Sequence, residues 1–110
     1  MATRERIRID MGNIETTEHT LYTVGTGKLL VVTSIVMVNR DSNSRTATWR
    51  VGHGGASYYV LQEAVAAGVS SLHPYVGWTL PAGDTLKVGT PAVNAGTFWF
   101  EANGVLYTLP

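Results

Sequence analysis

The chain has 110 residues, with eight Lys or Arg and eight Asp or Glu, so its formal net charge at pH 7 is zero. This length fits one domain with one core, and the balanced charge excludes a global field that would draw the protein to nucleic acid or to an anionic membrane. The absence of cysteine excludes disulfides and thiolate metal sites and favours synthesis in a reducing compartment.

Neither a secretory signal nor a membrane-spanning helix is expected. The N-terminus is charged from Arg4 onward and no apolar segment follows it. The longest apolar stretch, residues 29–38, is interrupted by Thr33 and Ser34 and is about half as long as a transmembrane helix. Only 15% of the residues are charged, which is few for a small free monomer, so we expect self-association.

The first segment alternates arginine with other residues, placing Arg4, Arg6 and Arg8 on one strand face and isoleucines on the other. We expect residues 1–18 to be an N-terminal arm or edge strand, packed on or extending from a β-sandwich domain over residues 19–110. The arginines would either meet acidic groups of a neighbouring subunit or form a solvated edge that resists aggregation.

Residues 28–39 form the strongest predicted strand, because they are rich in β-branched residues. Both faces are apolar. Strict alternation groups Leu29, Val31, Ile35 and Met37 against Leu30, Val32, Val36 and Val38. A strand with two apolar faces should be central in its sheet or covered by a neighbouring subunit.

Residues 45–51 alternate again, which predicts that Ala47, Trp49 and Val51 point inward. Further strands are expected at 58–61, 71–80 and 84–88, the last two joined by the turn Pro81-Ala82-Gly83-Asp84. The best helical candidate, residues 62–67, is at most two turns long.

Aromatic residues supply the candidate interface anchors. Tyr58 and Tyr59 are adjacent in a strand and must point to opposite faces, so one should be exposed for subunit contact or for stacking on a sugar. Trp99 shares a strand face with Glu101, opposite the phenylalanines, which suits an interface contact. The complete predicted interface set is Arg4, Arg6, Arg8, Tyr58, Tyr59, Trp78 and Trp99.

The sequence is expected to end in a hairpin, because Asn103-Gly104 is a preferred two-residue type I′ turn. Turn-forming residues recur along the whole chain and no long segment shows helical apolar spacing. Together these patterns predict an all-β fold, an antiparallel two-sheet sandwich or jelly roll of about seven to eight short strands.

No motif predicts catalysis, a cofactor or a metal ion. The run Gly25-Thr26-Gly27-Lys28 lacks the first glycine and the final Ser or Thr of a phosphate-binding loop. His19, His53 and His73 lack metal-ligand spacing, and no G-x-S-x-G nucleophile elbow occurs. We therefore expect a protein that is not an enzyme, with no catalytic, metal or cofactor-binding residues.

Three runs, LYTVGTGKLLVVTSIVMVN, VGWTLPAGDTLKVGT and FWFEANGVLYTL, follow one another in an order that resembles small structural proteins of tailed bacteriophages. The resemblance implies a virion protein, made in the bacterial host cytoplasm, that forms a homo-oligomer such as a trimer or ring without a cofactor. It would attach to the capsid surface as a decoration or stabilising protein, with the major capsid protein as a partner. A neck or tail adaptor or a spike component is the alternative within that class.

A second hypothesis from the residues alone is a carbohydrate-binding or receptor-binding β-sandwich module. Exposed Tyr58, Tyr59, Trp78 or Trp99 would then form a stacking platform for a sugar.

Overall fold

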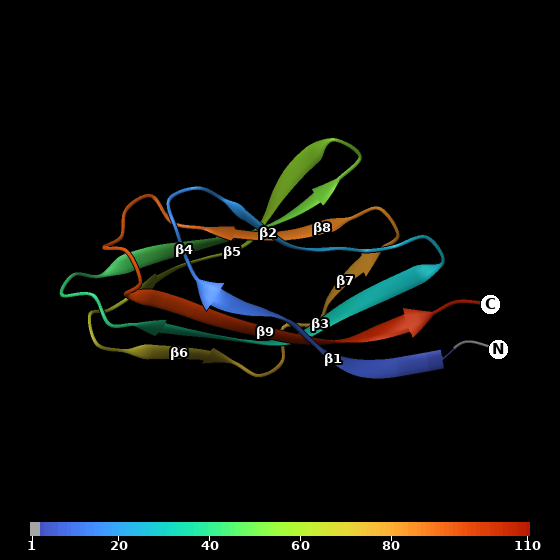
Figure 1. Ribbon diagram of the computed structural model, residues 1–110, viewed down its shortest axis with the longest axis horizontal. Helices are drawn as coiled ribbons and strands as arrows, with labels where there is room; N and C mark the ends of the chain where they lie inside the picture. The colour runs from blue at the N-terminus through green and yellow to red at the C-terminus, as the bar shows by residue number, and fades with distance from the viewer. Residues whose placement is uncertain (1–2) are drawn as a thin grey trace.

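The computed structural model describes residues 3–110, a range in which β-strands joined by turns account for the regular structure and no helix occurs. Two antiparallel sheets pack face to face in a body of 49 × 27 × 18 Å (Figure 1). The strands are β1 (Thr3–Asn13), β2 (His19–Thr23), β3 (Lys28–Asn39), β4 (Arg45–His53), β5 (Ala56–Val65), β6 (Ser70–His73), β7 (Trp78–Pro81), β8 (Thr85–Gly89) and β9 (Phe98–Thr108).

The strands pair in a nested order: β1 with β9, β2 with β8, β3 with β6 and β7, and β4 with β5. Sheet A has the order β1-β9-β3-β6, with β7 also on β3, and sheet B has the order β2-β8-β4-β5. Since β6 and β7 follow one another along the same edge of β3, they fill one position between them. This arrangement is a jelly roll, which confirms the predicted all-β, two-sheet fold.

The core lies between the two sheets and centres on Trp49. Its ring lies 5.7 Å from that of Phe100 in an edge-to-face arrangement and 6.1 Å from that of Trp78. Trp49 and Ala47 are fully buried and Val51 packs against the core, so the predicted inward face of residues 45–51 is confirmed.

A bulge between Val32 and Ser34 decides which side chains of β3 enter the core. Before it, Leu30 and Val32 point inward, and after it Ile35 and Met37 do so. The predicted faces of residues 28–39, which assumed strict alternation, are therefore wrong beyond Val32. The extra residue shifts the period-two pattern by one position. The predicted central position is confirmed, because β9 pairs on one side of β3 and β6 and β7 on the other.

The predicted hairpin at Asn103-Gly104 is wrong, because β9 is one continuous strand through both residues. It has a partner along each edge, β1 and β3, so a straight strand forms two hydrogen-bonded ladders where a hairpin would form one. Gly104 serves close packing: a Cβ atom there would lie 2.5 Å from the Val31 carbonyl oxygen and 3.0 Å from Cδ1 of Ile9.

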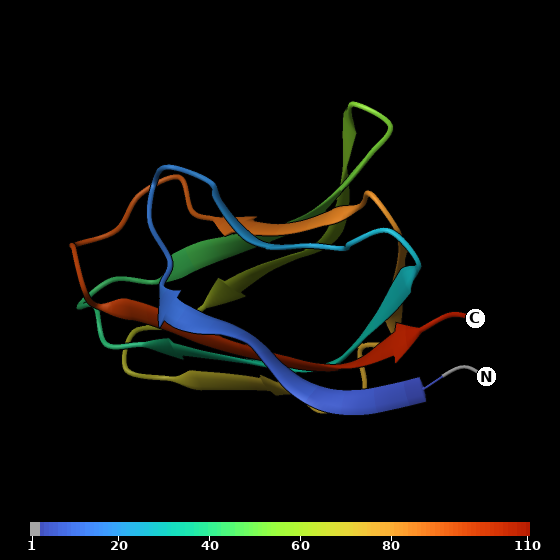
Figure 2. The same cartoon turned by 45° about the vertical axis from the view of Figure 1, so that its right-hand side comes forward.

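The two-residue hairpin occurs instead between β4 and β5. Gly54 and Gly55 have φ of 59° and 84°, and His53 pairs with Ala56, which is the geometry of a type I′ turn. The tip of this hairpin stands out from the body (Figure 2). The predicted short helix at 62–67 is also wrong, since β5 extends to Val65 and pairs with β4.

The remaining predicted strands are present with one interruption. Residues 71–80 are divided into β6 and β7 at the point where Val76 N–H donates to the Thr33 carbonyl, opposite the bulge in β3. The predicted turn after β7 is present: Asp84 N–H donates to the Pro81 carbonyl, and Gly83 has φ of 91°. This turn carries the chain from sheet A to sheet B.

Candidate functional site

The face of sheet A that points away from the core carries many apolar side chains along its central strands, with Glu101 and Asn103 of β9 between them. On β3, the half-buried residues Leu29, Val31, Val36 and Val38 alternate with core residues on either side of the bulge. The register places Tyr107, Val105 and Trp99 of β9 beside them, and exposed Leu72 and Met11 extend the set onto β6 and β1. We call these nine side chains the apolar face. A solvated sheet face is ordinarily polar, so this one has the composition of a contact surface.

Three arginines border the apolar face along the edge of sheet A. Arg4, Arg6 and Arg8 are exposed on β1, which pairs with β9 and has no partner on its other edge among residues 3–110. None of them forms an ion pair within that range. A groove of about 780 Å³ extends from Arg6 and Arg8 to Tyr75, which is 95% exposed. Within residues 3–110, the arginines thus lie beside apolar groups and form no ion pair.

The tryptophans singled out in the sequence have different surroundings. Trp99 is half-buried on the apolar face and, with Val38 and Arg40, lines a depression of about 340 Å³. Trp78 instead pairs with Val32 on the inner side of sheet A and packs against the core. The structure therefore brings Trp99 together with the arginine-bearing sheet and leaves Trp78 with the core.

Tyr58 and Tyr59 lie on β5, in sheet B, far from the apolar face. They are 54% and 64% exposed. Tyr59 lies beside Arg50, whose Nη2 donates to the Tyr59 hydroxyl at 2.7 Å. The predicted interface set is thus scattered: the three arginines and Trp99 lie on the outer face of sheet A, Tyr58 and Tyr59 lie on sheet B, and Trp78 packs with the core.

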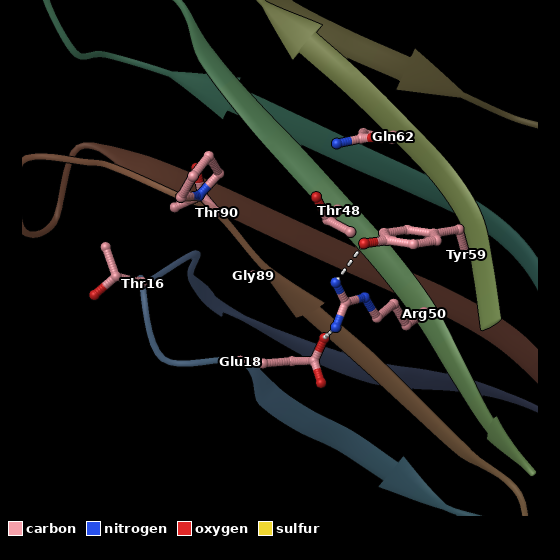
Figure 3. A pocket seen from close by; sticks show the side chains of 9 residues that line it. Thr16, Glu18, Thr48, Arg50, Tyr59, Gln62, Gly89 and Thr90 are labelled. Atoms are coloured by element: carbon pink, nitrogen blue, oxygen red, sulfur yellow. Dashed lines mark hydrogen bonds and ion pairs between the residues drawn. The ribbon is translucent and has the colours of Figure 1, made fainter. Parts of the chain in front are cut away.

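A polar cleft of about 320 Å³ lies on the outer face of sheet B (Figure 3). Its lining includes Thr16, Glu18, Thr48, Arg50, Tyr59 and Gln62. Of these, sequence reasoning identified Tyr59 alone as a site residue. The cleft is formed by the loop before β2, by β4 and β5, and by the end of β8. These segments are far apart in the sequence, so no local motif predicts the cleft.

One cluster contains the residue types of a catalytic triad without its geometry. The Ser71 hydroxyl donates to the Glu63 carboxylate, and His73 Nε2 lies 2.8 Å from Glu63 Oε2 and 3.2 Å from Ser71 Oγ. In a triad, the two ring nitrogens of the histidine contact the nucleophile and the carboxylate separately. Here one nitrogen faces both groups. The cluster links β5 of sheet B to β6 of sheet A, which is a structural connection between the sheets.

Within residues 3–110, no three His, Asp or Glu side chains come together as a set that could hold a metal ion. The same residues contain no helix with the length and hydropathy of a membrane span.

Comparison with known proteins shows the fold and no family. No family profile and no curated protein sequence matches the chain. One similar solved structure is a chain of the disulfide-linked pili that form Bacillus endospore appendages, with a TM-score of 0.58 and 17% identity over 99% of this chain and 89% of that one.

Similar structures also include chains of infectious bursal disease virus. The T13 viral particle gives a TM-score of 0.56 at 12% identity over 98% of this chain, and the Gx strain gives 0.51 at 13% over 98%. This chain spans about a third of the length of those viral chains, 31% and 32%. The fold is therefore one found in a pilus and in virus particles, and the closer resemblance to tailed-bacteriophage proteins stays a prediction.

Proposed function

We propose that the protein is a non-enzymatic structural protein of a virion, which assembles through the apolar face of sheet A. The observation that carries the proposal is the apolar composition of that face on β3 and β9, the two central strands of the sheet. Its fold, shared with a pilus protein and with virus particle proteins, supports an assembly role.

Burial of the apolar face between copies would supply the free energy of association. Full burial of an exposed apolar side chain contributes about 1.5–3 kcal/mol, and association costs about 4–15 kcal/mol. Seven of the nine side chains are already half-buried and would contribute less than that each, so most of them must be buried together. The apolar face has nine, arranged in adjacent rows across the sheet.

The uneven distribution of charge on the surface would orient the copies relative to one another in such an assembly. Three of the eight basic residues lie on β1, while the chain as a whole is neutral. Exposed Glu15, beyond the end of β1, forms no ion pair within residues 3–110. The arginine edge of one copy and acidic groups of the next would attract one another, which favours a trimer or ring.

In the virion, the oligomer would decorate and stabilise the capsid of a tailed bacteriophage by contact with the major capsid protein, after synthesis in the host cytoplasm. A neck or tail adaptor or a spike would use the same surface. Repeated weak contacts around a closed ring would stabilise the shell without any one tight site.

Light scattering over a concentration series tests this proposal. The unmodified protein should have the mass of an oligomer, and Val38→Lys should shift it to monomer because a charge then lies in the apolar face. Thr46→Lys is the matched control, since Thr46 is a half-buried β-branched residue on the outer side of a central strand of sheet B. A strict monomer that also fails to bind purified capsid shells would overturn the proposal.

A further inference from the structure

The polar cleft on sheet B has a floor made of backbone. Gly89 pairs with Thr48 at the end of β8, and a Cβ atom on Gly89 would lie 3.3 Å from the Cα of Glu18. The loop before β2 passes over this position, where Thr90 N–H donates to the Glu15 carbonyl at 3.0 Å. The absence of a side chain at 89 thus lets the loop form one wall of the cleft.

Arg50 is held in one orientation inside the cleft (Figure 3). Its Nη1 lies 3.3 Å from Glu18 Oε2, its Nη2 donates to the Tyr59 hydroxyl, and its guanidinium carbon lies 4.5 Å from the centre of the Tyr59 ring. Its Nε is the one buried side-chain nitrogen or oxygen without a hydrogen-bond partner among residues 3–110. Burying an unpartnered donor costs free energy, and such local costs are typical of functional sites.

Several polar groups of the cleft have no partner of their own. The hydroxyls of Thr16 and Thr48 and the amide of Gln62 take part in none of the side-chain hydrogen bonds within residues 3–110, although all three line the cleft. Hydroxyls and amides both donate and accept hydrogen bonds. Beside them, the Tyr59 side chain is 64% exposed; Arg50 lies over one face of its ring, so a ligand would pack on the other face.

We propose that this cleft binds a neutral saccharide, such as the hexopyranose end of a glycan. A sugar ring has C–H groups that pack on an aromatic ring and hydroxyls that both donate and accept hydrogen bonds. Tyr59 matches the first property. Glu18, an acceptor, and Arg50, a donor, lie side by side and match the second.

Other ligand classes fit the cleft less well. The Glu18 carboxylate neutralises Arg50 and would repel a phosphate or another anion. An apolar ligand would leave the lining hydroxyls and the Gln62 amide buried without partners. The volume of about 320 Å³ is at the lower end of the range for ligand pockets, roughly 300–1,000 Å³, which suits a short glycan end.

The inference goes beyond the assembly role and does not depend on it. The cleft lies on the outer face of sheet B, and the apolar face lies on the outer side of sheet A, so contacts through sheet A leave the cleft open. In an oligomer, each copy would present one cleft, and several weak saccharide contacts would combine into stronger attachment.

The test uses the whole chain on an array of neutral and acidic glycans. We expect binding to neutral glycans that end in a hexopyranose, and loss of about tenfold or more in affinity for Tyr59→Ala. Gln62→Ala, a change at an exposed position, should weaken binding without affecting folding. The matched control is Tyr58→Ala, on the same strand with similar exposure and outside the cleft, which should bind like the unmodified protein.

Three outcomes would overturn the proposal, provided that circular dichroism shows each variant to be folded. They are the absence of binding to every neutral glycan, an equal loss for Tyr58→Ala and Tyr59→Ala, and binding to acidic glycans alone that depends on Arg50 and is unchanged by Tyr59→Ala. The last would identify an anion site. Light scattering on the same samples separates failure of saccharide binding from failure of assembly.

Discussion

Arg45 donates a hydrogen bond from Nε to Oδ2 of Asp41 at 2.8 Å, and the Asp41 side chain is completely buried. Asp41 also accepts from the backbone N–H and side-chain amide of Asn94, each at 3.0 Å, and from the Thr97 hydroxyl at 3.2 Å. One carboxylate therefore connects the loop after β3 to the loop before β9. The hydrogen bond from Arg45, followed by that from the Asn94 backbone, holds the pKa of Asp41 well below its usual range.

This lowered pKa predicts a specific dependence of stability on pH. Since the folded pKa of Asp41 lies below its ordinary value of 3.8, its contribution to stability is complete above that value and is lost as the pH falls through the folded pKa. Asp41→Asn should be less stable at neutral pH and should lose less stability between about pH 4 and pH 2.5. Urea unfolding at several pH values measures both effects, and acid profiles of the two proteins that run parallel would contradict the assignment.

A second prediction concerns the aromatic core. Phe100 is buried against the Trp49 ring, so Phe100→Ala should lower the free energy of unfolding by about 3–5 kcal/mol through loss of packing and creation of a cavity. Tyr75→Ala is the control, because that side chain is 95% exposed, and it should change stability by about 0.5 kcal/mol or less. Urea titration followed by tryptophan fluorescence would compare the two.

A third prediction compares a glycine required by close packing, Gly104, with a glycine required by a positive φ, Gly54. Gly104→Ala should destabilise by about 1–3 kcal/mol, because the added Cβ meets the Val31 carbonyl oxygen in a packed sheet. Gly54→Asn should cost much less, because Gly54 has a positive φ that asparagine tolerates and open space around it. Thermal unfolding of both variants would show the order, and a neutral Gly104→Ala would argue against a continuous β9.

A fourth prediction concerns the connection between the sheets at β5 and β6. β6 has four residues and, among residues 3–110, pairs with β3 alone, while Ser71 and His73 contact Glu63 of sheet B. Glu63→Ala should therefore increase hydrogen exchange at the amides of β6, with a small loss of global stability of about 1 kcal/mol or less. Exchange confined to other strands would show that the cluster does not hold β6.

The sequence predicted the features that depend on local pattern. The strands at 28–39 and 45–51, the turn at 81–84 and the two-sheet class all followed from alternation and from turn residues. The errors arose where the conformation of a segment depends on strands that are distant in the sequence. Asn103-Gly104 has the local signature of a hairpin, but β1 and β3 flank it on both sides and keep it extended. The bulge in β3 lies at Thr33-Ser34, the two polar residues that interrupt the apolar run, and strict alternation ignored that interruption.

The same reasoning explains what was missed at the surfaces. Tyr59 was identified as an exposed aromatic residue, but its neighbours Glu18 and Arg50 are separated from each other by more than thirty positions in the sequence and meet only after the jelly roll has formed. In the sequence, Trp78 and Trp99 are both tryptophans in predicted strands, and nothing local distinguishes them. The register of β7 on β3 shows that Trp78 packs with the core. Exposure depends on pairing, which a single sequence does not reveal.

The central place of β9 in sheet A determines when the strands of this sheet can pair during synthesis. Residues 98–108 separate β1 from β3, so until they have been synthesised β1 has no strand to pair with and β3 has its partners β6 and β7 along one edge alone. Until then the apolar strand β3 lacks the partner that covers one of its edges, which exposes the nascent chain to aggregation. Pairing across such long sequence separations is slow, on the order of milliseconds to seconds. Production of folded protein should therefore improve at lower temperature, because the hydrophobic attraction that drives aggregation weakens on cooling; the yield of soluble protein at two expression temperatures measures this.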